Sequence, residues 1–270
     1  MAATALLGRG QSKAYVEAFE KVDRAVAKEN WAEAEAALLE ALQRDPDNEV
    51  SWMVISNLGM MQYYQGKDSL ALATLATGLQ SYPRSITMLA NRARILTDTG
   101  KIARALDDYD TILSIDSLNA DAYLNRGLLN LYFGDLEQAR RDIDKRLELR
   151  PDNSESWLAG ATLFTILEEP AQALPYYNRL ILEHPTSGYY AGRAFCLLAT
   201  EHYADAADDI AAGLELDPEN PELYLCRAIL HKLRYENDEA LTDAQRAISY
   251  GADPNRVRQI LGFCSAASAK

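Results

Sequence analysis

Small and apolar residues recur along the chain at an almost constant spacing. An alanine returns at intervals of 33 to 37 residues, at Ala34, Ala71, Ala105, Ala139, Ala173, Ala206 and Ala240. Twelve positions before each alanine except the first stands another small residue, at Gly59, Ala93, Gly127, Ala161, Ala194 and Ala228. A period of this length indicates stacked supersecondary units, which bury their apolar faces only against one another. The pattern therefore predicts an array of repeats whose function lies on its surface.

Each repeat carries the apolar positions of two helices. A large residue precedes the small one by four positions, at Ile55, Leu89, Tyr123, Trp157, Tyr190 and Tyr224. An aliphatic residue follows the alanine by eight positions, at Leu42, Leu79, Leu113, Leu147, Ile181, Leu214 and Ile248. Glycines between the two helices, at Gly66, Gly100 and Gly134, tolerate the left-handed conformation that ends a helix. Prolines near the ends of five repeats then stop the second helix, at Pro46, Pro83, Pro151, Pro185 and Pro218.

This pattern resembles the tetratricopeptide repeat, a family of helix-turn-helix units of about 34 residues. The fourth repeat has the family's landmarks in order, at Tyr123, Asn125, Gly127, Gly134, Asp135, Ala139, Ile143, Pro151 and Asn153. The resemblance covers residues 15–254 and implies an all-α fold, a right-handed superhelical α-solenoid. Seven repeats are expected, at 15–48, 52–85, 86–119, 120–153, 154–186, 187–220 and 221–254. An N-terminal extension is expected at 1–14, and a capping helix with a frayed tail at 255–270.

Two repeats depart from the pattern. In the first repeat Lys21 and Val22 stand where a bulky and a small residue are usual, so we expect a rotated or partly irregular first helix. In the fifth repeat Pro170 and Pro175 bracket the start of the second helix. Because Pro175 removes one intrahelical hydrogen bond, we expect a bend or a delayed start there.

Four repeats carry a matched pair of opposite charges. Arginine directly precedes the small residue, and aspartate follows sixteen positions later, in the pairs Arg92 and Asp108, Arg126 and Asp142, Arg193 and Asp209, and Arg227 and Asp243. The other three repeats have neither member. This co-occurrence favours structural ion pairs between the first and second helix of a repeat. The alternative is a ladder of arginines that recognises an acidic partner.

Composition and charge limit the classes of partner. The chain of 270 residues has 27 Lys and Arg against 40 Asp and Glu, a net charge of −13. This charge disfavours nucleic acid and anionic lipid. No stretch approaches the roughly 20 apolar residues of a membrane span. Three cysteines without CxxC spacing, Cys196, Cys226 and Cys264, are predicted to be free buried thiols.

The resemblance implies that the first helices line a concave groove that binds the partner. Carried over to this chain, the partner-binding residues are Tyr63, Tyr64, Asn91, Arg94, Asn125, Leu128, Tyr132 and Leu158. Amides can bond to a peptide backbone, while tyrosine and leucine supply contact area. The alternative for Leu128 and Leu158 is packing of one repeat on the next. Asp121 and Glu155 stand where the carboxylate-binding subclass needs basic residues, so we expect a partner with apolar anchors and basic flanks.

Candidate chemistry is sparse. The three histidines, His184, His202 and His231, have no metal-ligand spacing, and the chain has no glycine-rich phosphate loop and no GxSxG motif. We therefore expect no metal, no cofactor and no enzymatic activity, and interpret the chain as a scaffold or adaptor that binds a peptide or protein. The alternatives are a targeting arm or subunit of a larger enzyme or secretion assembly, and an array that self-assembles end to end. We expect a monomer, with a dimer or an end-to-end assembly as the alternatives. The sequence does not identify the compartment: the cytoplasm is favoured, and export after removal of a signal stays open.

Overall fold

The computed structural model describes residues 13–46 and 49–262, which form fifteen α-helices and no strands. The predicted N-terminal extension and the tail beyond residue 262 lie almost wholly outside this part of the chain. The prediction of an all-α array of helical repeats is confirmed. The chain falls into two compact units, Met1–Leu129 and Asn130–Lys270, and we call these the N-terminal and C-terminal units.

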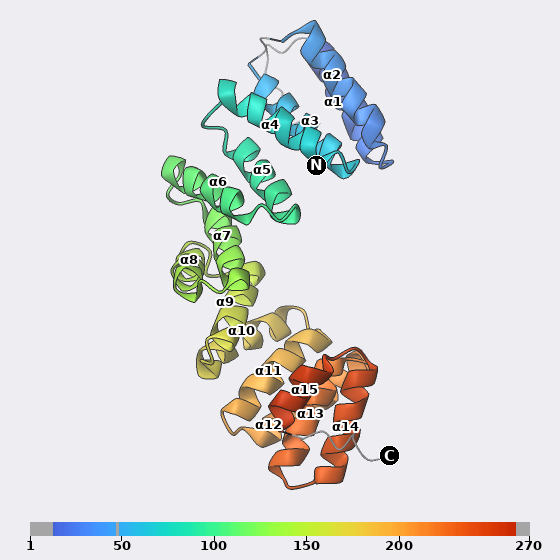
Figure 1. Ribbon diagram of the computed structural model, residues 1–270, viewed down its shortest axis with the longest axis vertical. Coiled ribbons are helices and arrows are strands. Elements are labelled where there is room, and N and C mark those ends of the chain that lie inside the picture. Colours follow the sequence, from blue (N-terminus) through green and yellow to red (C-terminus); the bar gives the residue numbers. More distant parts are fainter. Residues whose placement is uncertain (1–12, 47–48, 263–270) are drawn as a thin grey trace. The chain divides into compact units, whose positions relative to one another are not determined.

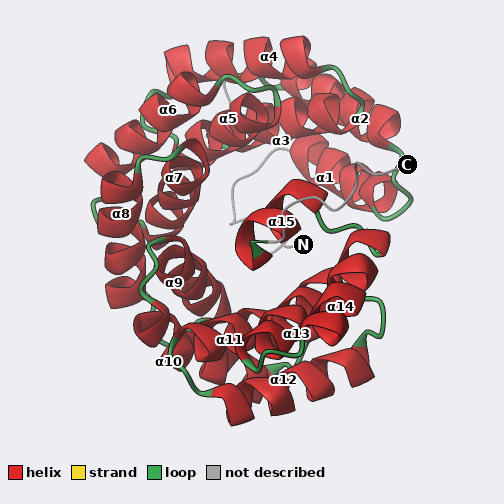
Figure 2. Ribbon diagram, turned by 60° about the horizontal axis from the view of Figure 1, so that its bottom comes forward, coloured by secondary structure: helices red, strands yellow, loops and turns green. Residues whose placement is uncertain are grey.

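The N-terminal unit consists of helix pairs. Its helices are α1 (Lys13–Val26), α2 (Trp31–Arg44), α3 (Ser51–Tyr64), α4 (Asp68–Ser81), α5 (Ile86–Asp98), α6 (Ile102–Ile115) and the larger part of α7 (Ala120–Phe133) (Figure 1). The pairs α1 and α2, α3 and α4, and α5 and α6 pack as hairpins, and α3 also contacts α5. Within this unit, Figure 2 shows α3 and α5 in one layer and α4 and α6 in another. One surface of the unit is therefore formed by first helices.

The C-terminal unit repeats this arrangement. Its helices are α8 (Leu136–Leu149), α9 (Ser154–Ile166), α10 (Pro170–Glu183), α11 (Ser187–Ala199), α12 (Tyr203–Leu216), α13 (Pro221–Leu233), α14 (Asn237–Ser249) and α15 (Pro254–Leu261). Successive pairs again pack as hairpins, and α11 contacts α13. The short α15 packs against both α13 and α14. Asp253 accepts a hydrogen bond from the backbone N–H of Asn255 and caps this helix, with Pro254 in its first turn.

The recurring alanines lie where the two helices of a repeat come closest. All seven, from Ala34 to Ala240, are completely buried. The first helix needs a small residue for the same reason. A β-carbon on Gly59 would lie 2.7 Å from Cγ of Leu75 on the second helix. The spacing seen in the sequence therefore records the close contacts of a helix hairpin.

The turn inside every repeat contains one residue in the left-handed conformation. Three are the glycines noted in the sequence, Gly66, Gly100 and Gly134. At the equivalent position the other four repeats have residues with a side chain, at Glu29 (φ 54°), Glu168 (φ 57°), Glu201 (φ 64°) and Tyr235 (φ 65°). These four carry a steric cost of about 1–2 kcal/mol each that glycine avoids. The repeat geometry therefore overrides the local preference of the residue.

Two irregularities expected from the sequence are absent: a break in the first helix and a delayed start of the second helix in the fifth repeat. The first helix, α1, is one continuous helix in which Val22 is buried. The second helix of the fifth repeat, α10, begins at Pro170 and contains Pro175 in its interior, so its start is not delayed. Pro170 occupies the first turn, where its missing N–H would have no intrahelical acceptor in any case, and packing of α10 against α9 retains the helix across Pro175.

Candidate functional site

In the N-terminal unit, the last turn of α3 meets the last turn of α5. The hydroxyl of Tyr63 donates a hydrogen bond of 2.5 Å to Oδ2 of Asp98. The guanidinium carbon of Arg94 lies 5.9 Å from the centre of the Tyr63 ring. The hydrogen bond to Asp98, together with burial, raises the pKa of Tyr63 above its ordinary value. Two residues of α5 therefore contact Tyr63, Asp98 at its hydroxyl and Arg94 at its ring.

Aromatic rings continue from this contact toward α2. The centre of the Tyr64 ring lies 5.6 Å from that of Tyr63 and 4.9 Å from that of Trp31 at the start of α2. Tyr64 remains exposed. We call these three residues, Trp31, Tyr63 and Tyr64, the aromatic cluster. The two tyrosines were predicted from the sequence, whereas Trp31, which lies on a second helix, was not.

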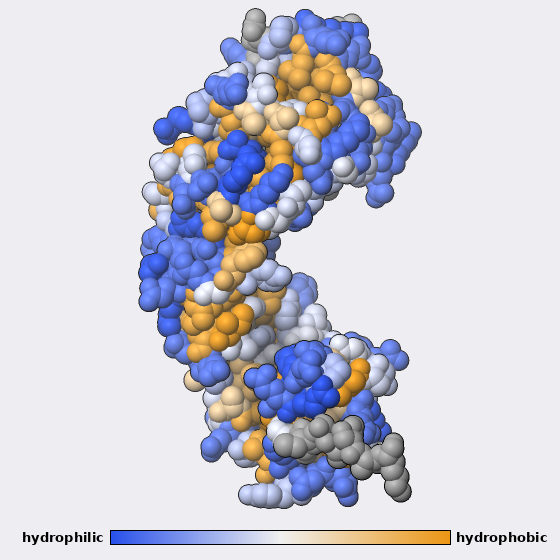
Figure 3. Space-filling model, in the orientation of Figure 1, coloured by the Kyte–Doolittle hydropathy of each residue, from blue (hydrophilic) through white to orange (hydrophobic). Residues whose placement is uncertain are grey.

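On the other side of Arg94 lies a pocket of about 510 Å³. It is lined by α5, α6 and α7, with Ala90, Asn91, Arg94, Thr97, Asp98, Tyr109, Asn125, Leu128 and Leu129. We call it the α5–α7 pocket. The pocket lining includes four of the eight residues predicted from the sequence to bind the partner. Apolar and strongly hydrophilic surface lie side by side on the helices of this unit (Figure 3).

The two asparagines of the pocket are each anchored through one amide N–H. Asn91 donates a hydrogen bond of 2.9 Å to the hydroxyl of Ser56 on α3. Asn125 donates one of 2.8 Å to the backbone carbonyl of Asp121. Neither amide oxygen accepts a hydrogen bond from the described residues. Both asparagines can therefore accept hydrogen bonds from a bound chain.

Tyr109 is a pocket residue that the sequence analysis missed. It follows the buried Ala105 by four positions, where most other repeats have Leu, Ile or Ala. Its exposed fraction is 6%. Burial raises its pKa to about 12, with contributions from the charges of Asp108 and Asp98, and Arg94 acts in the opposite direction. A polar aromatic residue at a position that is aliphatic in five of the other six repeats is the signal that could have found it.

The remaining two nominated residues belong to the C-terminal unit. Tyr132 is 83% exposed, and the centre of its ring lies 4.9 Å from that of Phe133 in an edge-on arrangement. Leu158 on α9 is also exposed. The structure thus brings together Tyr63, Tyr64, Asn91, Arg94, Asn125 and Leu128 in the N-terminal unit. Tyr132 and Leu158 contribute surface to the other unit.

Three of the four predicted charge pairs lie between the two helices of a repeat. In three of them both carboxylate oxygens accept from one guanidinium, at 2.5 and 2.9 Å for Arg92 and Asp108, 2.6 and 2.7 Å for Arg193 and Asp209, and 2.7 and 2.8 Å for Arg227 and Asp243. All three aspartates are buried, and the hydrogen bonds raise the pKa of each arginine. Such bidentate contacts are the strong form of an ion pair. Arg126 donates 2.5 Å to Asp110, and its pairing with Asp142, which belongs to the other unit, stays a prediction.

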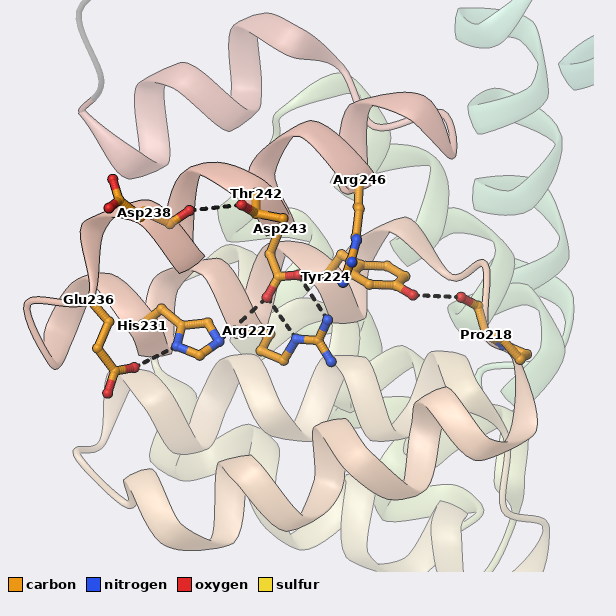
Figure 4. Close-up of polar contacts among 9 residues, drawn as sticks. All are labelled: Pro218, Tyr224, Arg227, His231, Glu236, Asp238, Thr242, Asp243 and Arg246. Atoms are coloured by element: carbon orange, nitrogen blue, oxygen red, sulfur yellow. Dashed lines mark hydrogen bonds and ion pairs between the residues drawn. The ribbon is translucent and has the colours of Figure 1, made fainter.

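In the last repeat the charge pair extends into a cluster (Figure 4). Nδ1 of His231 lies 2.6 Å from Oε2 of Glu236, and its Nε2 lies 3.5 Å from Oδ2 of Asp243. Arg246 also reaches Asp243, at 3.4 Å. The guanidinium groups of Arg227 and Arg246 lie 5.0 and 5.8 Å from the centre of the Tyr224 ring. These groups satisfy one another across α13 and α14, which favours a structural role for His231.

The structure also describes possible metal ligands, two of the three cysteines and the apolar character of the helices. Within the described residues, no group of three or more His, Cys, Asp or Glu side chains is arranged to hold a metal ion. Cys196 and Cys226 are buried free thiols, and burial raises the pKa of Cys226 to about 12. Cys264 lies outside the described residues. None of the helices between residues 13 and 262 has both the length and the apolar character needed to cross a membrane.

Comparisons with known proteins point to one family. The model of the tetratricopeptide repeat matches residues 90–154. The crystal structure of a tetratricopeptide repeat protein from Parabacteroides merdae matches this chain with a TM-score of 0.64 and 29% identity, over 93% of this chain and 98% of that one. YrrB, described as a tetratricopeptide repeat protein with an unusual peptide-binding site, matches with a TM-score of 0.59 and 22% identity, over 70% of this chain and 98% of that one. This last likeness shows the shared fold.

A relative of known sequence is similar over a shorter stretch. RNA polymerase II-associated protein 3 from Mus musculus is 31% identical over 104 residues. The match covers 38% of this chain and 16% of that relative, so this chain corresponds to a small part of the relative's length.

Proposed function

Because this chain is a tetratricopeptide repeat protein, we propose that it is a non-enzymatic scaffold that binds a peptide segment of a partner on the α3, α5 and α7 surface of its N-terminal unit. Tetratricopeptide repeats are protein interaction modules, and proteins of this family bind peptides or proteins. The observation that carries the proposal is the continuity between the aromatic cluster and the α5–α7 pocket, which meet at Tyr63 and Arg94.

The chemistry of this surface suits an extended chain. The aromatic cluster offers exposed ring surface, and tyrosine and tryptophan are enriched among residues that dominate binding energy. The amide oxygens of Asn91 and Asn125 can accept from backbone N–H groups, which every peptide supplies. Leu128 adds apolar contact at the edge of the pocket. YrrB, which shares the fold, is described as having a peptide-binding site, and this supports the same role here.

The overall charge favours a partner with basic residues beside its apolar anchors. The chain has a net charge of −13, so flanking lysines or arginines would be attracted to it at long range. We expect this attraction to raise the association rate more than the affinity.

Selection from a phage-displayed library of random peptides tests the proposal. Wild type is compared with a Tyr63→Ala, Tyr64→Ala double variant, after circular dichroism shows equal helix content. We expect wild type to enrich peptides that the double variant does not bind.

A matched control removes a tyrosine from elsewhere. Tyr235 is 90% exposed at the turn between α13 and α14, so Tyr235→Ala should leave the selection unchanged. Adding Tyr132→Ala to the double variant tests that nominated residue separately. Equal enrichment by wild type and the double variant, or none by either, would contradict the assignment of this surface as the peptide-binding site. Sedimentation of the same samples tests the predicted monomer.

A further inference from the structure

Arg94 is an arginine without an acceptor at the entrance of the α5–α7 pocket. It lies one helical turn before Asp98, a spacing at which an arginine and an aspartate commonly form an ion pair. Here Oδ2 of Asp98 is occupied by the hydroxyl of Tyr63 at 2.5 Å, and the Arg94 guanidinium lies over the Tyr63 ring instead. Arg94 makes no hydrogen bond or ion pair with any described residue. Its donors therefore remain available in the pocket that it lines.

The hydroxyl of Tyr109 is a second polar group without a partner in the same pocket. The residue is more than nine-tenths buried, and its hydroxyl makes no hydrogen bond with any described residue. Tyr109 lines the pocket together with Asp98 and Arg94, whose charges act on its pKa in opposite directions. Buried hydroxyl groups nearly always have a hydrogen-bond partner. A group bound in the pocket that Tyr109 lines can supply this partner.

The fifth repeat shows what a tyrosine at this position does when it has only a packing role. Tyr177 follows Ala173 by four positions, as Tyr109 follows Ala105. Its ring fills the space beside Gly192, where a β-carbon would lie 2.4 Å from Cζ of Tyr177. Burial raises the pKa of Tyr177, and its side-chain hydrogen bond with Thr165 opposes this shift. Tyr177 is thus accounted for within its own unit, whereas Tyr109 faces a pocket.

We propose that the α5–α7 pocket binds the carboxylate of an aspartate or glutamate side chain of the partner, with Arg94 and Tyr109 as its donors. A carboxylate accepts only, and it matches one cationic and one neutral donor. Ala90, Leu128 and Leu129 can cover the methylene groups of such a side chain. This inference rests on the proposed function and adds the class of residue that the pocket recognises.

The position of the pocket favours a side chain over a chain terminus. The aromatic cluster lies on the α2 and α3 side of Arg94, and Leu128 on α7 lies on the other side. A peptide that contacts both continues past the pocket in each direction and offers a side chain to it. Because the pKa of Tyr109 is about 12, its hydroxyl keeps the donated proton throughout the neutral pH range.

Three blocked amino acids test the pocket directly. N-acetyl-glutamate methylamide carries only a side-chain carboxylate, N-acetyl-leucine only a terminal one, and N-acetyl-glutamine methylamide none. The NMR signals of the Arg94 Nε–H group and the Tyr109 ring are followed during titration of the full chain with each probe. We expect both signals to shift with the glutamate probe, and with neither of the other two.

Variants identify the donors. Arg94→Gln should weaken binding of the glutamate probe about tenfold or more, since hydrogen bonds to a charged group are the stronger kind. Tyr109→Phe keeps the buried ring and should weaken binding severalfold, while the matched Tyr177→Phe should change nothing. Equal shifts with the glutamine probe, larger shifts with N-acetyl-leucine, no shifts at all, or unchanged affinity in Arg94→Gln would overturn the inference.

The probes and the peptide selection can fail separately. Binding of the glutamate probe without any selected peptide would contradict the scaffold and leave the carboxylate pocket in place. Selected peptides that bind without an acidic residue, together with a silent probe, would contradict the pocket and leave the scaffold in place.

Discussion

The third and fifth repeats hold their two helices together in different ways. In the third repeat, Arg92 on α5 and Asp108 on α6 form a bidentate ion pair with contacts of 2.5 and 2.9 Å. In the fifth repeat, Gly160 and Tyr176 occupy those two positions. There the ring of Tyr176 stacks on Phe164, with 5.9 Å between centres and 5° between planes. A β-carbon on Gly160 would lie only 3.3 Å from the Tyr176 ring.

The difference teaches that the repeat requires a filled space between its helices, and that two kinds of contact can fill it. An ion pair depends on both members, because removal of one leaves a buried charge. Aromatic packing depends on shape, because an added atom has no room. We therefore expect the third repeat to be sensitive to deletion and the fifth to addition.

The largest expected effect is loss of one member of the ion pair. Arg92→Ala leaves Asp108 buried without its cation and should lower the free energy of unfolding by about 3 kcal/mol. Urea unfolding followed by circular dichroism measures the change. Asp108→Ala and the double variant complete a thermodynamic cycle, in which the double variant should lose less than the sum. A coupling energy near zero would contradict a structural role for the pair.

The next effect is an added atom in the C-terminal unit. Gly192→Ala places a β-carbon 2.4 Å from Cζ of Tyr177 and should lower the free energy of unfolding by about 2 kcal/mol. Gly188→Ala on the same helix is the matched control, because the nearest side-chain atom there is 4.0 Å away. It should leave stability unchanged or raise it. Alanine favours a helix more than glycine does, so an equal loss in both variants would contradict the assignment of the effect to the contact with Tyr177.

Exchanging the turn residue of the third repeat and that of the fifth should change the free energy of unfolding by less, with opposite signs. Gly100 and Glu168 occupy the same turn position with φ of 72° and 57°. Glu168→Gly should raise the free energy of unfolding by about 1 kcal/mol, and Gly100→Glu should lower it by a similar amount. Thermal unfolding of both variants measures the shifts. A change of the same sign in both would mean that contacts of the side chains outweigh the backbone conformation.

The smallest effect is a pH dependence that comes from the buried Tyr109 of the third repeat. Folding raises the pKa of Tyr109 from 10.0 to about 12, first through burial and then through Asp108 and Asp98. The unfolded chain therefore loses this proton first, and stability falls as the pH rises from about 10 toward 12. At pH 10.5 this part of the loss should be below about 1 kcal/mol. Urea unfolding at pH 8 and pH 10.5 should show a smaller decline for Tyr109→Phe than for wild type, and an equal decline would contradict the shift.

Much of the fold could be predicted from the sequence. The alanine spacing identified the helix contacts, and all seven alanines are completely buried. The three turn glycines marked the left-handed position, but Glu29, Glu168, Glu201 and Tyr235 hold the same conformation without a local signal. The delayed start expected near Pro175 is absent, because α10 begins at Pro170 and its contacts with α9 outweigh one lost hydrogen bond. Local preference thus predicted the elements until packing opposed it.

The candidate site could be predicted only in part. Tyr63, Asn91, Arg94 and Asn125 were nominated from the resemblance, and the structure places them on one surface. Trp31 and Tyr109 were missed because both lie on second helices, which the resemblance assigns to the outer layer. Outside the candidate site, the burial of Arg146 was not predicted either, because its charged neighbours along the chain indicate a solvent-exposed face. Arg146 is 2% exposed, and it donates hydrogen bonds at the start of α9 to Ser156, Asn153 and Glu155.

By itself the sequence determined the periodicity, the helices and the pairs of residues that meet inside a repeat. These depend on short separations along the chain, where helix geometry and a fixed spacing leave few alternatives. Only the tertiary structure decided which polar groups have partners. Arg94 makes no hydrogen bond to Asp98, whose Oδ2 accepts from Tyr63 of the preceding repeat, and Tyr109 lines a pocket that α7, from the following repeat, completes. Such outcomes depend on the neighbours that other repeats supply, and no single repeat contains that information.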